Sequence, residues 1–357
     1  MQMTTRQKFF KAVKRETGDY VPFELRLCPF LEKKFVTKSG LEDYPAYFGM
    51  PLRFVTAPVR KRDDNFSRYF LGTDKAVDID VWGVGHIKGD LQHFTRMVHP
   101  MESFDKVEDF ITYPYPDPDH DFDWEYIQAR VKELSCQDLV SYGFMPFTIF
   151  EISWYLRGLE NLLSDMILNH EMVEYHLDRI TGIRCEMARE YALAGVDVLF
   201  IGDDVATQLN MMMSGEMWRK YLKPRLKKVI DTAKSIKSDI LIDYHSDGNI
   251  QEIISDLVEV GIDILNPVQP ECMDPVKIKE IYGDRLSFRG TVGTQTTMPF
   301  GTTDDVKRVC IEMIHKVGEN GGLILAPTHI LEPEVPWENI ETLVETVREY
   351  NEAHFIE

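Results

Sequence analysis

Short apolar runs alternate along the chain with longer segments of helical periodicity. Eight runs have the length and composition of buried strands, and the second of them has the weakest pattern: residues 21–27, 52–57, 139–144, 197–201, 240–244, 262–265, 286–289 and 323–326. Strands that alternate with helices indicate βαβ units and a parallel sheet. Eight such units predict an α/β protein built as a single TIM-type (β/α)8 barrel over residues 1–357.

The helical segments carry readable start and stop signals. Residues 218–235 have helical periodicity but contain Pro224, which should end or kink a helix because proline lacks an N–H. Residues 250–260 form an amphipathic pattern that runs up to Gly261, and residues 304–317 follow an N-cap sequence at Thr302. Residues 1–14 are also helical in pattern, which predicts an N-terminal helix before the first strand.

Residues 61–118 do not fit the strand–helix repeat. They contain an aromatic cluster at 66–70, alternating apolar residues at 77–84 and a proline-rich stretch at 113–118. We interpret this region as a hairpin and loop insertion laid over one barrel end. A second domain is the less favoured interpretation.

Composition restricts the class of partner. The formal net charge is −19, which argues against nucleic acid and anionic membranes, because both attract basic surfaces. No stretch approaches the length of a membrane span, and residues 1–14 lack the apolar core of a signal peptide, so we expect a cytoplasmic protein. The five cysteines are scattered and are interpreted as reduced thiols. Whether the chain forms a homodimer is left open.

Active sites of such barrels lie where the strands end. His245 and Asp247 directly follow the fifth predicted strand, and His329 follows the eighth. Imidazole and carboxylate are zinc ligands, and three protein ligands with one open position form a catalytic zinc site. The trio is therefore predicted to bind Zn²⁺, with loop capping as the alternative.

Other strand ends add candidate catalytic and substrate-binding residues. Asp203 and Asp204 follow the fourth strand and Glu151 follows the third, where they can act as general base, orient a ligand or cap a helix. Glu151 and Asp204 are also alternatives to Asp247 as metal ligand. The predicted substrate-binding residues are Glu24, Arg26, Phe144, Phe147 and Gln295.

A second motif shares His245. Asp243-Tyr-His245-Ser-Asp-Gly248 matches the D-x-H-x-x-G pattern through which corrinoid-carrying domains supply a histidine to cobalt. Those domains also carry an S-x-L element, whereas the corresponding stretch here reads Ser287-Phe-Arg289. Corrinoid binding by this chain itself is therefore a minor alternative.

The chain resembles the uroporphyrinogen decarboxylase superfamily over nearly its whole length. The segments that carry the resemblance are Pro22–Arg26, Gly195–Asp204, Ser214–Trp218, Tyr244–Asn249, Gly290–Gln295, Gly322–Pro327 and Val335–Asn339. One branch of this superfamily is the cofactor-free decarboxylase of haem synthesis, which binds eight carboxylates through an Arg-Gln-Ala-Gly-Arg element. Here that stretch reads Glu24-Leu-Arg26-Leu-Cys28, and a carboxylate facing a polyanion disfavours binding.

The other branch comprises zinc-dependent methyltransferases that work with corrinoids. Its members carry H-x-C after the fifth strand and a second Cys after the eighth, and the matching positions here are His245, Asp247 and His329. Replacing thiolates by Asp and His makes a bound zinc harder and more electrophilic, which suits activation of an ether oxygen. The resemblance therefore implies a methyltransferase that moves a methyl group from a methoxylated compound, aromatic ethers included, to cobalt(I) on a separate corrinoid protein. The alternative is a decarboxylase acting on a tetrapyrrole or a smaller acid.

Overall fold

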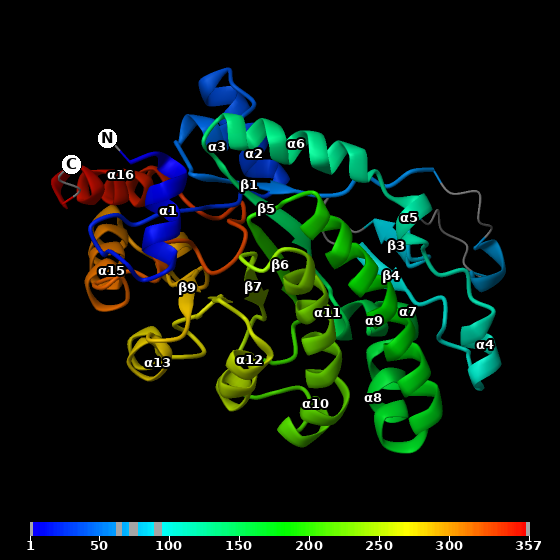
Figure 1. Ribbon diagram of the computed structural model, residues 1–357. Coiled ribbons are helices and arrows are strands. Elements are labelled where there is room, and N and C mark those ends of the chain that lie inside the picture. The colour runs from blue at the N-terminus through cyan, green and yellow to red at the C-terminus, as the bar shows by residue number, and fades with distance from the viewer. Residues whose placement is uncertain (1–2, 62–65, 71–77, 89–94, 355–357) are drawn as a thin grey trace.

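A curled parallel sheet forms the centre of the protein. The computed structural model describes residues 3–61, 66–70, 78–88 and 95–354 (Figure 1). Neighbouring strands pair in parallel in the order β1-β5-β6-β7-β8-β9-β10. Their bounds are β1 (Leu52–Val55), β5 (Val140–Met145), β6 (Val198–Gly202), β7 (Leu241–His245), β8 (Ile264–Asn266), β9 (Ser287–Arg289) and β10 (Leu323–Ile324).

The first predicted strand, residues 21–27, lies beside β10 without forming a continuous ladder. Phe23 and Leu325 form one isolated parallel bridge, and Leu27 forms another with Leu331. Pro22 lacks an N–H, which removes one ladder bond at the start of this segment. The other seven predicted runs coincide with ladder strands, including the weak second one, and the TIM-type fold is confirmed.

Helices cover the outside of the sheet (Figure 1). Those before β6 are α1 (Thr5–Val13), α2 (Pro29–Ser39), α3 (Tyr44–Tyr47), α4 (Val107–Ile111), α5 (Pro118–Asp121), α6 (Trp124–Cys136), α7 (Phe150–Arg157), α8 (Leu159–Leu168) and α9 (His170–Leu193). Those after it are α10 (Gly215–Tyr221), α11 (Lys223–Ile236), α12 (Ile254–Val260), α13 (Pro275–Tyr282), α14 (Thr297–Phe300), α15 (Thr303–Lys316) and α16 (Trp337–His354).

The predicted signals at Pro224, Gly261 and Thr302 are confirmed, whereas the helix predicted from residue 218 begins earlier, at Gly215. Pro224 lies in the first turn of α11, so the segment divides into α10 and α11 at the expected place. A 3₁₀ turn at Gln251–Ile253 precedes α12, which Gly261 ends in a left-handed conformation with φ of 99°. Thr302 caps α15 through a capping box.

The N-terminal helix α1 closes the bottom of the barrel. Phe9 and Val13 pack with Tyr142 in the apolar cluster inside the sheet. Arg6 forms an ion pair with Asp197, just before β6. Because side chains fill this end of the barrel, the open end is the one at the C-terminal ends of the strands.

The insertion contains a small antiparallel sheet of β2 (Asp78–Ile79), β3 (Gly85–Lys88) and β4 (Thr95–Val98). It lies beside α7 and α9 (Figure 1), where the Arg184 guanidinium is 4.7 Å from the Trp82 ring. The alternating run 77–84 is not one strand: Asp80 accepts hydrogen bonds from the N–H groups of Trp82 and Val84 and forms a turn. Residue 77 lies outside the described residues.

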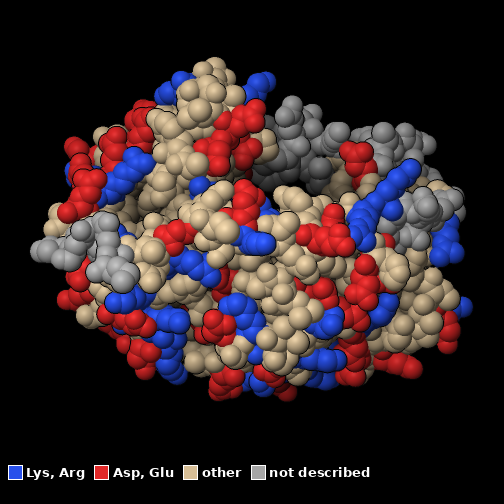
Figure 2. Space-filling view, turned by 45° about the horizontal axis from the view of Figure 1, so that its top comes forward, with Lys and Arg blue, Asp and Glu red and all other residues tan. Residues whose placement is uncertain are grey.

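The distribution of charged side chains on the surface is consistent with the formal net charge of −19. Acidic and basic side chains are interspersed over the face shown in Figure 2, and the described residues form no extended basic patch on that face. Within the same residues, no helix has the length and apolar character needed to span a bilayer.

A buried histidine makes the fold sensitive to acid. In α9, His176 Nδ1 lies 3.0 Å from the Tyr115 hydroxyl, and Nε2 lies 3.1 Å from the Ser153 carbonyl oxygen. Burial lowers the pKa of His176 to about 4. Because the unfolded pKa is near 6.5, the stabilisation is present above that pH and is lost as the pH falls towards 4.

We therefore expect His176→Gln to flatten the pH dependence of folding. Between about pH 7.5 and about pH 5 the histidine should account for roughly 2 kcal/mol of lost unfolding free energy. Urea titrations of both proteins at the two pH values check this. Equal losses in the two proteins would contradict the assignment.

Candidate active site

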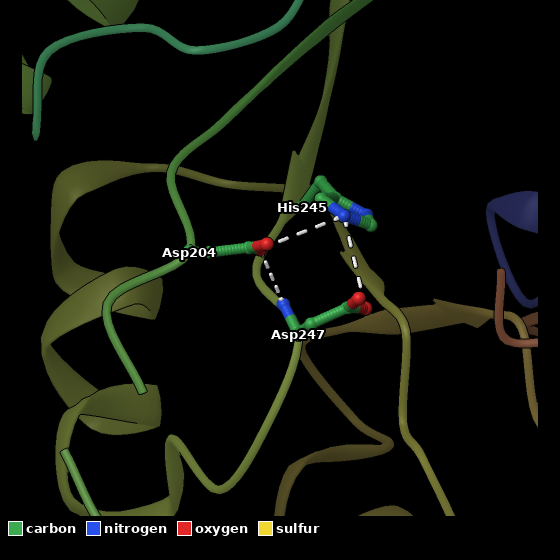
Figure 3. Close-up of side chains that lie close together, drawn as sticks. All are labelled: Asp204, His245 and Asp247. Atoms are coloured by element: carbon green, nitrogen blue, oxygen red, sulfur yellow. Dashed lines mark hydrogen bonds and ion pairs between the residues drawn. The ribbon is translucent and has the colours of Figure 1, made fainter. Parts of the chain in front are cut away.

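Two adjacent strand ends bring three polar side chains together. In the β6–β7 register Gly202 pairs with His245, and Asp203 N donates to the His245 carbonyl oxygen at 3.0 Å. The chain after β6 therefore places Asp204 beside the chain after β7, which carries Asp247. The side chains of Asp204, His245 and Asp247 point toward one another (Figure 3).

Gly202 permits this close approach of the strands. A Cβ atom at this position would lie 2.1 Å from the His245 carbonyl oxygen, which is backbone and cannot move freely. We expect Gly202→Ala to lower the free energy of unfolding by about 3 kcal/mol in urea titrations. Gly182→Ala is the matched control, because nothing lies within 4 Å of a Cβ there. In α9 that change should leave stability unchanged or raise it by up to about 1 kcal/mol. Equal effects of the two substitutions would contradict this account.

The three side chains have the spacing of a metal site. His245 Nε2 lies 3.7 Å from Asp204 Oδ1 and 3.8 Å from Asp247 Oδ1. One ligand atom from each residue lies within 4.8 Å of the others. Tetrahedral zinc with bonds of about 2.1 Å separates its ligand atoms by roughly 3.4 Å. Small side-chain movements bring these atoms to that separation.

Asn266 determines which nitrogen of His245 carries the proton. Arg289 Nη2 donates to Asn266 Oδ1 at 2.9 Å, and Asn266 Nδ2 donates to the Arg289 carbonyl oxygen at 2.8 Å. A guanidinium has no acceptor, so the amide oxygen must face it. That same oxygen lies 2.7 Å from His245 Nδ1, which must therefore donate. In the neutral imidazole, Nε2 is then a lone-pair acceptor facing two carboxylates.

The electrostatics of the cluster favour the binding of a cation. Burial lowers the pKa of His245 to about 4, so its neutral form predominates at neutral pH. Burial also raises the pKa values of Asp204 and Asp247. Asp247 Oδ1 is buried and has no hydrogen-bond partner among the described residues. Such a set of acceptors fits a metal ion, and Asp204, His245 and Asp247 are the residues that would hold it.

His329 lies at the solvent side of this cluster. Its Nε2 is 3.9 Å from Asp247 Oδ2, and its side chain is 44% exposed. It borders a cavity of about 230 Å³ together with Asp247, Gln269 and Gln295. His329 is thus placed to complete a ligand set from the eighth strand end.

Glu151 and Asp203 lie behind the cluster, at the start of α7. Asp203 accepts hydrogen bonds from the backbone N–H groups of Ile149 and Glu151. Its carboxylate therefore orients α7 and does not belong to the set of candidate metal ligands. Glu151 Oε2 accepts from Asp204 N at 2.9 Å, and Oε1 accepts from the Tyr155 hydroxyl at 3.0 Å. Burial, reinforced by the Asp204 charge, raises the pKa of Glu151 well above its usual range.

A second, larger cavity of about 410 Å³ lies between residues 24–27 and β1. Arg26, Phe54 and Phe144 line it, and Ile330 borders both cavities. The two cavities therefore share a wall at Ile330.

Comparison with known proteins identifies the family. The uroporphyrinogen decarboxylase (URO-D) family model matches residues 90–350, which is most of the chain. The chain belongs to the URO-D family. The resemblance inferred from the sequence segments is thereby confirmed.

Relatives come from both branches of this family. The chain is 29% identical over 196 residues to methylcobamide:CoM methyltransferase MtaA of Methanosarcina barkeri, covering 55% of this chain and 54% of that protein. It is 25% identical over 218 residues to uroporphyrinogen decarboxylase of Pelodictyon phaeoclathratiforme, covering 59% of each. The chain thus spans little more than half the length of these curated relatives.

A solved structure supports the fold over the whole length. A methyltransferase from Methanosarcina mazei superposes with a TM-score of 0.70 and 20% identity, covering 98% of this chain and 99% of the other. At that identity the likeness concerns the fold.

Of the remaining predicted residues of this URO-D family member, Glu24 and Phe147 lie away from the cluster, whereas Gln295 borders the smaller cavity beside it. Glu24 pairs with Arg289 at 3.1 Å beneath the site. Phe147 is 42% exposed and contacts the ring of Tyr155. Gln295 accepts a hydrogen bond from Gln208 in the smaller cavity.

Sequence reasoning did not assign a role to Asn266 or identify the hydrogen bond between Tyr155 and Glu151. Asn266 pairs directly with His245 in the β7–β8 register, so equivalent positions at adjacent strand ends were the available signal. The Tyr155 bond follows from the i, i+4 spacing in α7.

Proposed function

We propose that this protein is a zinc-dependent methyltransferase that transfers a methyl group from a methoxylated compound to cobalt(I) on a separate corrinoid protein. The observation that carries the proposal is the unprotonated Nε2 of His245, which faces the two half-buried carboxylates of Asp204 and Asp247. Similarity to methylcobamide:CoM methyltransferases supports the link to corrinoids.

The ligand types favour an oxygen-bound methyl group. Carboxylate and imidazole are harder ligands than thiolate. They donate less charge to a bound ion and therefore reduce its Lewis acidity less. When bound, zinc supplies polarisation of the methoxyl oxygen. The C–O bond then breaks, the cobalt(I) electron pair forms the Co–C bond, and the oxygen leaves as an alkoxide that takes up one proton.

Protein residues supply the orientation and the proton. The Asp247 backbone N–H donates to Asp204 Oδ1 at 2.8 Å and fixes that carboxylate next to His245. Burial raises the pKa of Glu151 well above its usual range, which favours its protonated form, and Glu151 accepts a hydrogen bond from the backbone N–H of Asp204. We assign Glu151 the delivery of the proton to the leaving oxygen, and Asp204 the role of a metal ligand.

The alternative decarboxylase activity has less support from the cavity. The charged side chains that line the larger cavity are Glu24, Glu32, Arg26 and Arg53, which balance one another. A substrate with many carboxylates needs an excess of cationic partners. This lining therefore disfavours a polyanionic tetrapyrrole.

The test is methyl transfer from methoxylated compounds to cob(I)alamin, followed by its visible spectrum. We expect transfer with about one zinc per chain, its loss after chelation and its return when zinc is restored. Activity that survives chelation with release of CO2 would support the decarboxylase instead. Absence of both zinc binding and methyl transfer would contradict the proposal.

A further inference from the structure

Arg26 is an unsatisfied cation in the larger cavity. Its guanidinium makes no hydrogen bond within the described part of the chain, and its side chain is only 22% exposed. The nearest carboxylate oxygen is Glu24 Oε1, at 3.8 Å from Nε. A guanidinium has five N–H donors, so a partner with two acceptor oxygens is missing here.

Glu24, the nearest acidic neighbour, is only partly engaged by another group, because its Oε1 is buried without a hydrogen bond among the described residues and lies 3.8 Å from Arg26 Nε. Glu24 Oε2 accepts from Arg289 Nη1 at 3.1 Å, and Arg289 Nε donates to Asp243 at 2.7 Å. Arg53, the other arginine in the lining, donates to the carbonyl oxygens of Met50 and Leu52. Among the described residues, Arg26 is therefore the arginine of this lining without any side-chain hydrogen bond, whereas Arg53 has its Nη1 engaged.

Aromatic rings connect Arg26 with the metal ligands. The Arg26 guanidinium lies 5.7 Å from the Phe54 ring and 6.0 Å from the Phe144 ring. Phe144 stacks on Phe200 with centroids 5.1 Å apart, and the Phe200 ring lies 5.6 Å from that of His245. A cavity of about 410 Å³ accommodates one substituted aromatic ring.

We propose that this cavity selects a methoxylated aromatic monocarboxylate as methyl donor. Arg26 binds the carboxylate bidentately, Phe54 and Phe144 contact the ring, and the methoxyl group extends toward His245 and Asp247. The balanced charges of the lining limit the ligand to one carboxylate. The assignment of a methoxyl group to the ligand rests on the proposed methyl transfer, whereas the assignment of a carboxylate rests on Arg26 alone.

The experiment is calorimetric titration of the zinc-loaded protein with 2-, 3- and 4-methoxybenzoate and with methoxybenzene. We expect at least one isomer to bind about ten- to a hundredfold more tightly than methoxybenzene, as a charged hydrogen-bonded pair provides. Arg26→Gln should remove this preference, and Arg26→Lys should retain only part of it. Arg308→Gln, an exposed position on α15, is the control and should change nothing. Thermal melts verify that every variant is folded.

The outcomes separate the two proposals. Carboxylate-selective binding that depends on Arg26, without methyl transfer to cob(I)alamin, would support this inference and contradict the proposed function. Absence of saturable binding by all three isomers would overturn the inference. So would a carboxylate preference that persists in Arg26→Gln.

Discussion

Replacing His245 with alanine is expected to lower zinc affinity by at least about 100-fold and to abolish methyl transfer. Removing a metal ligand should lower zinc affinity more than removing a residue that only donates or accepts a hydrogen bond to that ligand. Without the imidazole, Asp204 and Asp247 are left as two half-buried carboxylates whose pKa values are already raised. The raised pKa values favour the protonated forms, which compete with metal binding. Zinc competition titrations and cob(I)alamin assays measure the two losses.

His315→Ala is the matched control, because His315 is an exposed histidine on α15. It should leave zinc content and activity at the level of the unaltered protein. Wild-type zinc affinity in His245→Ala would show that the metal lies elsewhere.

Replacing Asn266 with alanine is expected to weaken zinc binding by about 10- to 100-fold while the ligands themselves remain. Asn266 Oδ1 accepts the Nδ1–H of His245 and is itself held by Arg289. Without this acceptor the imidazole adopts either tautomer, and in one of them the proton on Nε2 blocks the metal. The same assays apply, and methyl transfer should fall with zinc occupancy.

A second buried asparagine separates this effect from simple destabilisation. Asn339 Nδ2 donates to the carbonyl oxygens of Met298 and Gly301, far from the metal ligands. Asn339→Ala should lower unfolding stability by about 1–3 kcal/mol and leave zinc affinity unchanged. If both variants lost zinc affinity in proportion to stability, Asn266 would have no specific role.

The alternation of apolar runs and helical segments was sufficient to predict the barrel, since each element buries its own apolar face. It failed where local signals compete: the alternating run 77–84 bends at Asp80 because that side chain binds two backbone N–H groups. Pro22 similarly interrupts the pairing expected of residues 21–27.

Part of the site could be predicted because strand ends meet at one end of a barrel. His245, Asp247 and His329 follow from that rule. The position of Asp204 among the ligands depends on the β6–β7 register, which the sequence does not specify. Likewise, the saturation of Asp203 by backbone N–H groups of α7 depends on contacts between residues about fifty positions apart.

Whether Arg26 is available to bind a substrate also depends on contacts between residues that are distant in the sequence. Arg26 and Arg289 both lie near strand ends, and the sequence alone does not show which of the two is available to a substrate carboxylate. The structure distinguishes them, because Arg289 is bound by Asp243, Glu24 and Asn266.

Anomalous diffraction at the zinc edge from zinc-loaded crystals tests the central claim most directly. We predict one peak per chain, about 2.0–2.2 Å from His245 Nε2 and from carboxylate oxygens of Asp204 and Asp247. His329 should be the nearest further side chain. A peak at any other position, or zinc-loaded protein without a peak between these three residues, would contradict the claim.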